Sequence, residues 1–205
     1  MKSSLVRHFS LARDDFFFLS ANLWVVKKID YLIKVRIYIM AIEITRAEAD
    51  TLVKTPLISQ LLIEWIKGEE SEKFPLANLA NAAAILQENL KQVNWAGFYL
   101  YDEKIDELIL GPFVGKAAVV RIKPGSGVVG NAFSKQETIR VADVHVFDGH
   151  IACDPASNAE IVVPLTTASG KRLGVLDIDS TAFNRFGIKE QAEIEHFTKI
   201  LLQYI

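Results

Sequence analysis

Between residues 94 and 180 the sequence is a succession of short segments rich in aromatic and β-branched residues and separated by turns. Such segments favour β-strands. Apolar residues at helical spacing occur before and after this stretch, at 46–67, 76–93 and 189–204, and only one short helical pattern, 124–136, interrupts it. The pattern therefore predicts an α+β fold with a mainly antiparallel sheet rather than alternating βαβ units. The expected strands are 94–102, 107–113, 117–122, 138–141, 160–166 and 172–180.

The composition limits the class of protein. The 205 residues are 50% hydrophobic and 23% charged, which is ordinary for one globular domain. The net charge of −2 offers no broad basic field for nucleic acid. The single cysteine, Cys153, excludes an internal disulfide framework and indicates a reducing, cytoplasmic compartment.

The first 39 residues differ in character from the rest. They contain neither glycine nor proline and carry seven Lys or Arg against three Asp or Glu. Their apolar run, 16–26, is too short to span a bilayer and lacks the flanks of a signal peptide. A peripheral amphipathic anchor is one reading of this segment. We expect instead that 1–39 is an extension, that translation begins at Met40, and that 40–205 forms a single domain without a membrane partner.

The stretch GVLDIDS, 174–180, places two carboxylates on one side of a strand. Since side chains alternate along a strand, Asp177 and Asp179 share a face with Val175. One reading is an edge strand with a solvated face. The other is the floor of a pocket for an ammonium or amidine, because buried carboxylates need a cationic partner. Glu160 would add a third acid if 160–166 pairs with this strand through a hairpin.

Two further patterns have a structural and a functional reading. Trp95 and Tyr99 lie on one face of their strand and Phe98 on the other, so the pair is either core or the wall of a pocket for a thioether and an ammonium. The run KPGSGVVG, 123–130, is either a plain turn and helix start or a nest of N–H groups for a small carboxylate. It lacks the Lys-Ser/Thr of a phosphate-binding loop.

Cys153 lies in a polar loop, 143–159, that also holds Asp143, His145, Asp148, His150 and Asp154. The spacing H-x4-H-x2-C matches no standard zinc pattern, so we predict no metal. A buried, inert thiol is one reading. A reactive thiol is the other, and a nearby imidazolium would lower its pKa.

These motifs together resemble the GAF-fold family of free methionine-(R)-sulfoxide reductases. The resemblance covers roughly 45–205 and is most specific in GHIACDPASNAEIVVPL and GVLDIDS. It implies a six-stranded antiparallel sheet flanked by helices, a cytoplasmic homodimer, no bound cofactor, and a pocket for free methionine sulfoxide rather than for methionine residues within proteins.

The resemblance also implies roles for individual residues. Cys153 matches the nucleophile, and Glu160, Asp177 and Asp179 match the acids that hold the substrate and supply a proton. Trp95 and Tyr99 match aromatic residues of the pocket.

The chain departs from the family at two positions. Two further cysteines of the family, which form the recycling disulfide with the nucleophile, are Val119 and Val129 here. We therefore expect an oxidoreductase that works through a Cys153 sulfenic acid and is recycled by an external small thiol, instead of the family's thioredoxin-linked disulfide. The alternatives are a GAF module that binds a small amino acid without catalysis, and a redox sensor based on Cys153.

Overall fold

The computed structural model describes residues 55–151 and 153–205. The expected extension 1–39, the start at Met40 and the helical pattern 46–54 lie outside these residues. The described chain forms a six-stranded sheet in the order β3-β2-β1-β6-β5-β4, in which every neighbouring pair is antiparallel. This confirms the predicted α+β fold.

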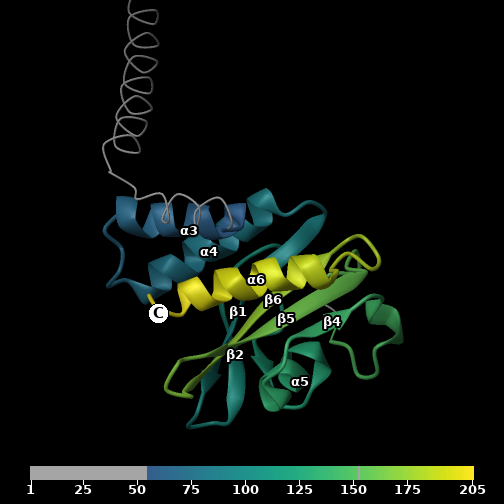
Figure 1. Ribbon diagram of the computed structural model, residues 1–205. Coiled ribbons are helices and arrows are strands. Elements are labelled where there is room, and N and C mark those ends of the chain that lie inside the picture. Colours follow the sequence, from purple (N-terminus) through teal and green to yellow (C-terminus); the bar gives the residue numbers. More distant parts are fainter. Residues whose placement is uncertain (1–54, 152) are drawn as a thin grey trace, which may run out of the picture. The chain divides into compact units, whose positions relative to one another are not determined.

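The elements follow one another as the sequence pattern indicates. The helices are α3 (Leu57–Gly68), α4 (Pro75–Asn89), α5 (Gly127–Lys135) and α6 (Ile188–Leu201), with a short 3₁₀ helix, η1 (Val144–Val146). The strands are β1 (Val93–Asp102), β2 (Glu107–Val114), β3 (Arg121–Ile122), β4 (Ile139–Val141), β5 (Ala159–Thr166) and β6 (Arg172–Ser180). As Figure 1 shows, α3, α4 and α6 lie on one side of the sheet and α5 lies on the other.

The predicted strand 117–122 is wrong in extent, because only Arg121 and Ile122 pair with β2. The carbonyl oxygen of Val120 still accepts from the Leu110 N–H of β2 at 2.9 Å, but the residues before it use their backbone groups differently. The carbonyl oxygens of Lys116 and Val119 accept hydrogen bonds from the side chains of Trp95 and Tyr99. These carbonyls are satisfied by side chains of β1, so the segment stays irregular.

The side of the sheet under α3, α4 and α6 holds the larger core. Each helix contributes a buried stripe at helical spacing, such as Ile58, Leu62 and Ile66 on α3. The strands contribute every second residue, including Phe98, Leu176 and Ile178. The helix predicted over 76–93 packs here through Leu79, Ala83 and Leu86. It ends at Asn89, after which Leu90 is extended.

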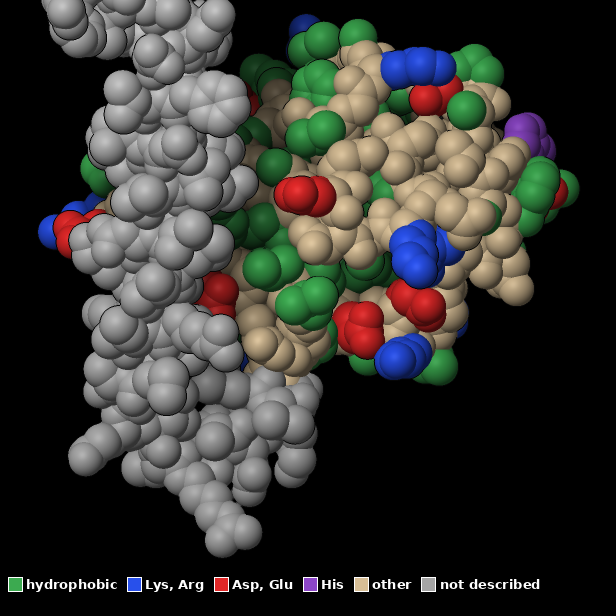
Figure 2. Space-filling model, turned by 90° about the horizontal axis from the view of Figure 1, so that it is seen from above, with side chains coloured by type: hydrophobic (Ala, Val, Ile, Leu, Met, Phe, Trp, Pro, Cys, Tyr) green, Lys and Arg blue, Asp and Glu red, His purple; other side chains and the backbone are tan. Residues whose placement is uncertain are grey.

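The exposed surface has no dominant charge on the face seen in Figure 2, where basic and acidic side chains are interspersed among apolar ones. This fits the near-neutral net charge of −2. None of the helices described between residues 55 and 205 is long and apolar enough to cross a membrane.

Candidate active site

Three carboxylates meet on the side of the sheet that carries α5. In the register of β5 and β6, Glu160 lies opposite Asp179, and Val162 lies opposite Asp177. All three acids are buried, and one oxygen of each lies within 4.8 Å of the others. The alternation of side chains along β6 and the hairpin to β5 therefore place these acids together, as the sequence indicates.

Burial and mutual repulsion keep protons on this cluster. Removal from water, together with charge repulsion, raises the pKa of Glu160 and of Asp177 well above the ordinary values, and the two carboxyl groups share a hydrogen bond. Burial raises the pKa of Asp179 to about 7, and a positive charge on His150 would oppose this rise. Within the described chain, Asp177 Oδ1 is buried without a hydrogen-bond partner. The cluster thus offers a carboxyl proton that can be donated to a ligand and, at Asp177 Oδ1, an oxygen that can accept a hydrogen bond from one.

The thiol of Cys153 lies beside this cluster in the same cavity. The backbone N–H of Val119 donates to Sγ at 3.5 Å. Burial raises the pKa of the thiol, and the charges of Asp177 and Asp179 raise it further, while the bond from the Val119 N–H opposes the rise. In the ligand-free site the thiol therefore holds its proton.

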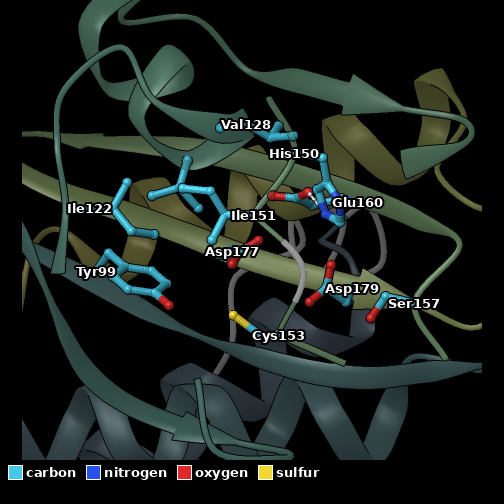
Figure 3. A pocket seen from close by; sticks show the side chains of 12 residues that line it. Tyr99, Ile122, Val128, His150, Ile151, Cys153, Ser157, Glu160, Asp177 and Asp179 are labelled. Carbon is cyan, nitrogen blue, oxygen red and sulfur yellow. Dashed lines mark ion pairs between the residues drawn. The ribbon is translucent and has the colours of Figure 1, made fainter. Parts of the chain in front are cut away.

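His150 does not supply the imidazolium expected from the sequence. Burial lowers the pKa of His150, so the ring is predominantly neutral at pH 7. Its Nε2 lies 3.5 Å from Glu160 Oε2, the contact drawn as a dashed line in Figure 3. His145 pairs instead with Asp143, at 2.8 Å, and does not line the cavity. The prediction that an imidazolium lowers the thiol pKa is therefore wrong.

The two aromatic residues of β1 occupy different positions. Tyr99 lines the cavity and donates its hydroxyl to the carbonyl oxygen of Val119 at 2.9 Å. Trp95 lies behind it, with ring centroids 6.1 Å from Tyr99 and 5.3 Å from Phe113, and is not among the lining residues. Both share one face of β1, while Phe98 joins the opposite core.

The glycine-rich run begins α5 beside the site. Gly127, Val128 and Val129 line the cavity at the first turn of that helix. Gly127 has φ +59 and lies against Ile151, so it takes a backbone conformation that glycine tolerates best. A carboxylate-binding role for this turn stays a prediction.

The cavity is small. Its volume open to the centre of a water molecule is about 20 Å³, which is room for one or two waters. The lining residues are Tyr99, Ile122, Gly127, Val128, Val129, His150, Ile151, Cys153, Ser157, Glu160, Asp177 and Asp179.

Sequence reasoning missed Asn94 and Ser157. Asn94 donates to Asp154 at 3.1 Å and to Ser157 at 2.9 Å, which ties the loop after Cys153 to the start of β1. The available signal was weak, since an Asn at a strand start and a Ser in a polar loop are both common in turns.

Comparison with known proteins identifies the domain family of this chain. The model of the GAF domain family matches residues 76–203 of this chain. Two relatives are called free methionine-R-sulfoxide reductase. The one from Escherichia coli (strain K12) is 59% identical over 111 residues, which cover 54% of this chain and 66% of that protein. The one from Saccharomyces cerevisiae is 37% identical over 158 residues, which cover 75% of this chain and 88% of that protein.

A solved structure agrees with these relatives. The free methionine-R-sulfoxide reductase from Neisseria meningitidis, solved in complex with its substrate, superposes with a TM-score of 0.64 at 39% identity. The match covers 72% of this chain and 83% of that one. The chain belongs to the free methionine-R-sulfoxide reductase family of GAF-domain proteins.

Proposed function

We propose that this protein reduces free methionine-R-sulfoxide to methionine with Cys153 as the attacking thiol. The observation that carries the proposal is the shared cavity, in which Cys153 lies beside three buried carboxylates with raised pKa values. The relatives' names supply the substrate. The acids supply the chemistry, because a sulfoxide accepts a sulfur nucleophile readily only when its oxygen is protonated.

The thiol must lose its proton before it attacks. The charges of Asp177 and Asp179 contribute to its raised pKa. A bound substrate ammonium would offset these charges, so we expect substrate binding to lower the thiol pKa. The site would then form its nucleophile chiefly when it is occupied.

The reaction balances without a bound cofactor. The Cys153 thiolate attacks the sulfoxide sulfur while a protonated carboxyl of the cluster, Glu160, Asp177 or Asp179, donates to the oxygen. The oxygen passes to the thiol sulfur, which leaves methionine, reduced by two electrons, and a Cys153 sulfenic acid. The unprotonated carboxylates pair with the substrate ammonium.

Regeneration requires an external thiol. A thiol attacks the sulfenic acid to give a mixed disulfide and water, and a second thiol releases Cys153 as a new disulfide forms. Val119 and Val129 leave no second cysteine within the chain. We therefore expect a low-molecular-weight thiol to serve better than thioredoxin, which acts most readily on a formed disulfide.

The test is incubation of the protein with each epimer of methionine sulfoxide and dithiothreitol, with methionine as the readout. The R epimer should give continuous release and the S epimer should give little. Without dithiothreitol, we expect about one methionine per Cys153, because each thiol is oxidised once. Absence of methionine from the R epimer would sink the proposal.

Variants that restore the family's cysteines test which reductant is used, separately from the test of activity. Because the Val119 N–H contacts Sγ, a cysteine at 119 has a better prospect of disulfide geometry than one at most positions. Val119→Cys, or Val129→Cys, should gain thioredoxin-dependent turnover. Efficient thioredoxin turnover by the unaltered protein would contradict this part of the proposal.

A second function is favoured by the two valines together with the raised thiol pKa. A GAF module of this kind would bind methionine sulfoxide, or undergo oxidation at Cys153, without turnover. Calorimetric binding of the sulfoxide without methionine release would favour the binding module.

The homodimer and the cytoplasmic location implied by the family stay predictions, and sedimentation measurements would check the dimer.

A further inference from the structure

Asp154 directly follows Cys153 and is buried, with 5% of its surface exposed. It accepts three hydrogen bonds from three parts of the chain. Its Oδ1 receives Lys116 Nζ at 2.8 Å and the backbone N–H of Ala156 at 2.9 Å. Its Oδ2 receives Asn94 Nδ2 at 3.1 Å. No acid of the cluster is held in this way.

Asp154 differs from the acids of the cluster in its protonation state. Its bonds to Lys116, Ala156 and Asn94 lower its pKa to about 2, so it stays charged throughout the neutral range. Asp177, by contrast, tends to keep a proton. Asp154 is therefore unsuited to donate a proton and suited to hold a permanent cation partner.

Lys116 begins the segment that contacts the thiol. Its carbonyl oxygen accepts from Trp95 Nε1 at 3.0 Å, and three residues later the carbonyl oxygen of Val119 accepts from Tyr99. The Val119 N–H then donates to Cys153 Sγ. The Lys116–Asp154 ion pair thus links the loop of the thiol to the segment that the thiol contacts.

We propose that Lys116 and Asp154 are positioning residues, whose ion pair holds Cys153 against the Val119 amide and beside the acid cluster. The acids themselves lie on β5 and β6, and no hydrogen bond of the described residues joins them to this pair, although the charge of Asp154 contributes to the raised pKa of Asp179. Loss of the pair should therefore misplace the nucleophile while leaving the acids in place. The inference rests on the proposed function for its kinetic effect, but not for its effect on the thiol.

The kinetic test uses Lys116→Met and Asp154→Asn with dithiothreitol as reductant. We expect kcat to fall about 10- to 100-fold, the scale of a small misplacement of reacting groups. KM and the calorimetric affinity for methionine-R-sulfoxide should change less than about threefold, because the acids remain. Lys116→Arg should restore most of kcat, and the double variant should be little worse than either single one.

Lys189→Met is the matched control, since Lys189 forms an exposed ion pair with Glu193 far along the chain from this loop. It should keep the kcat of the unaltered protein. A parallel loss of kcat and affinity in Lys116→Met would show a general role in the fold and overturn the positioning role. An unchanged kcat in Lys116→Met would overturn it as well.

The thiol itself provides a test that needs no turnover. Cys153 is the only cysteine, so iodoacetamide reports on it alone. Burial and the charges of Asp177 and Asp179 raise its pKa, whereas the bond from the Val119 N–H opposes the rise. In Lys116→Met the thiol should leave this environment, and alkylation at pH 7 should quicken several-fold as its apparent pKa falls. An unchanged alkylation profile would overturn the proposal, even if the unaltered protein released no methionine and the proposed function had failed.

Discussion

The two faces of the sheet use the same strands for different purposes. Along β6, Leu176 and Ile178 enter the core beneath α3, α4 and α6, whereas Asp177 and Asp179 enter the cavity on the side of α5. The helix-covered face holds the larger apolar core, with a few buried polar side chains such as Ser180. The cavity face combines a smaller apolar cluster with buried carboxylates whose ionisation is disfavoured. The alternation of a strand therefore lets the same strand contribute to the larger core on one face and to the chemistry on the other.

The largest effect should come from the cavity face. Cys153→Ser removes the nucleophile with little change in volume, and we expect no detectable methionine from methionine-R-sulfoxide with dithiothreitol. Its affinity for the sulfoxide and its urea unfolding midpoint should stay close to those of the unaltered protein. Methionine release by this variant would refute the role of the lone thiol.

A substitution in the core beneath α3, α4 and α6 should lower the stability of the fold. Leu176 is fully buried, so Leu176→Ala should lower the free energy of unfolding by about 2–5 kcal/mol in urea titrations. Leu76→Ala is the matched control, because Leu76 is 70% exposed, and we expect a change within about 0.5 kcal/mol. Similar losses in the two variants would show that the apolar face does not carry the stability.

Substitution of Asp177 or Asp179 should weaken the affinity for the substrate. If Asp177 and Asp179 meet the substrate ammonium, replacing either with Asn should weaken binding or transition-state stabilisation by about 2–4 kcal/mol. The unfolding free energy should hold or rise, because a buried acid beside two other acids is replaced by a neutral side chain of similar size. Asp148→Asn, in an exposed loop, is the control. Calorimetry with unchanged affinity in both cluster variants would remove these acids from the binding site.

The effect of a single pH unit is smaller than those of the substitutions above. Burial raises the pKa of Asp179 from 3.8 to about 7, so the folded protein binds a proton that the unfolded chain releases. The contribution of Asp179 to stability is therefore full below pH 4 and is lost as pH rises to about 7, with a slope of at most about 1.4 kcal/mol per pH unit. Relative to the unaltered protein, Asp179→Asn should gain unfolding free energy over this range and level off above it. A difference that does not vary with pH would contradict the raised pKa.

Local periodicity made much of this protein predictable from sequence. The period-two pattern of GVLDIDS predicts that Asp177 and Asp179 share a face, and the hairpin turn expected at 168–171, ASGK, predicts that Glu160 joins them. The i, i+3, i+4 spacing predicts the helices on either side of the strands. These features depend on residues close in sequence, whose geometry the backbone sets directly.

Tertiary structure decided what the loops do. The strand expected at 117–122 is short because Trp95 and Tyr99 take up the carbonyl groups of Lys116 and Val119. His150 has a lowered pKa because it is buried, and Asp154 has a lowered pKa because Lys116, 38 positions away, reaches it. Contacts between distant segments set burial and charge in these places, and no local pattern encodes them.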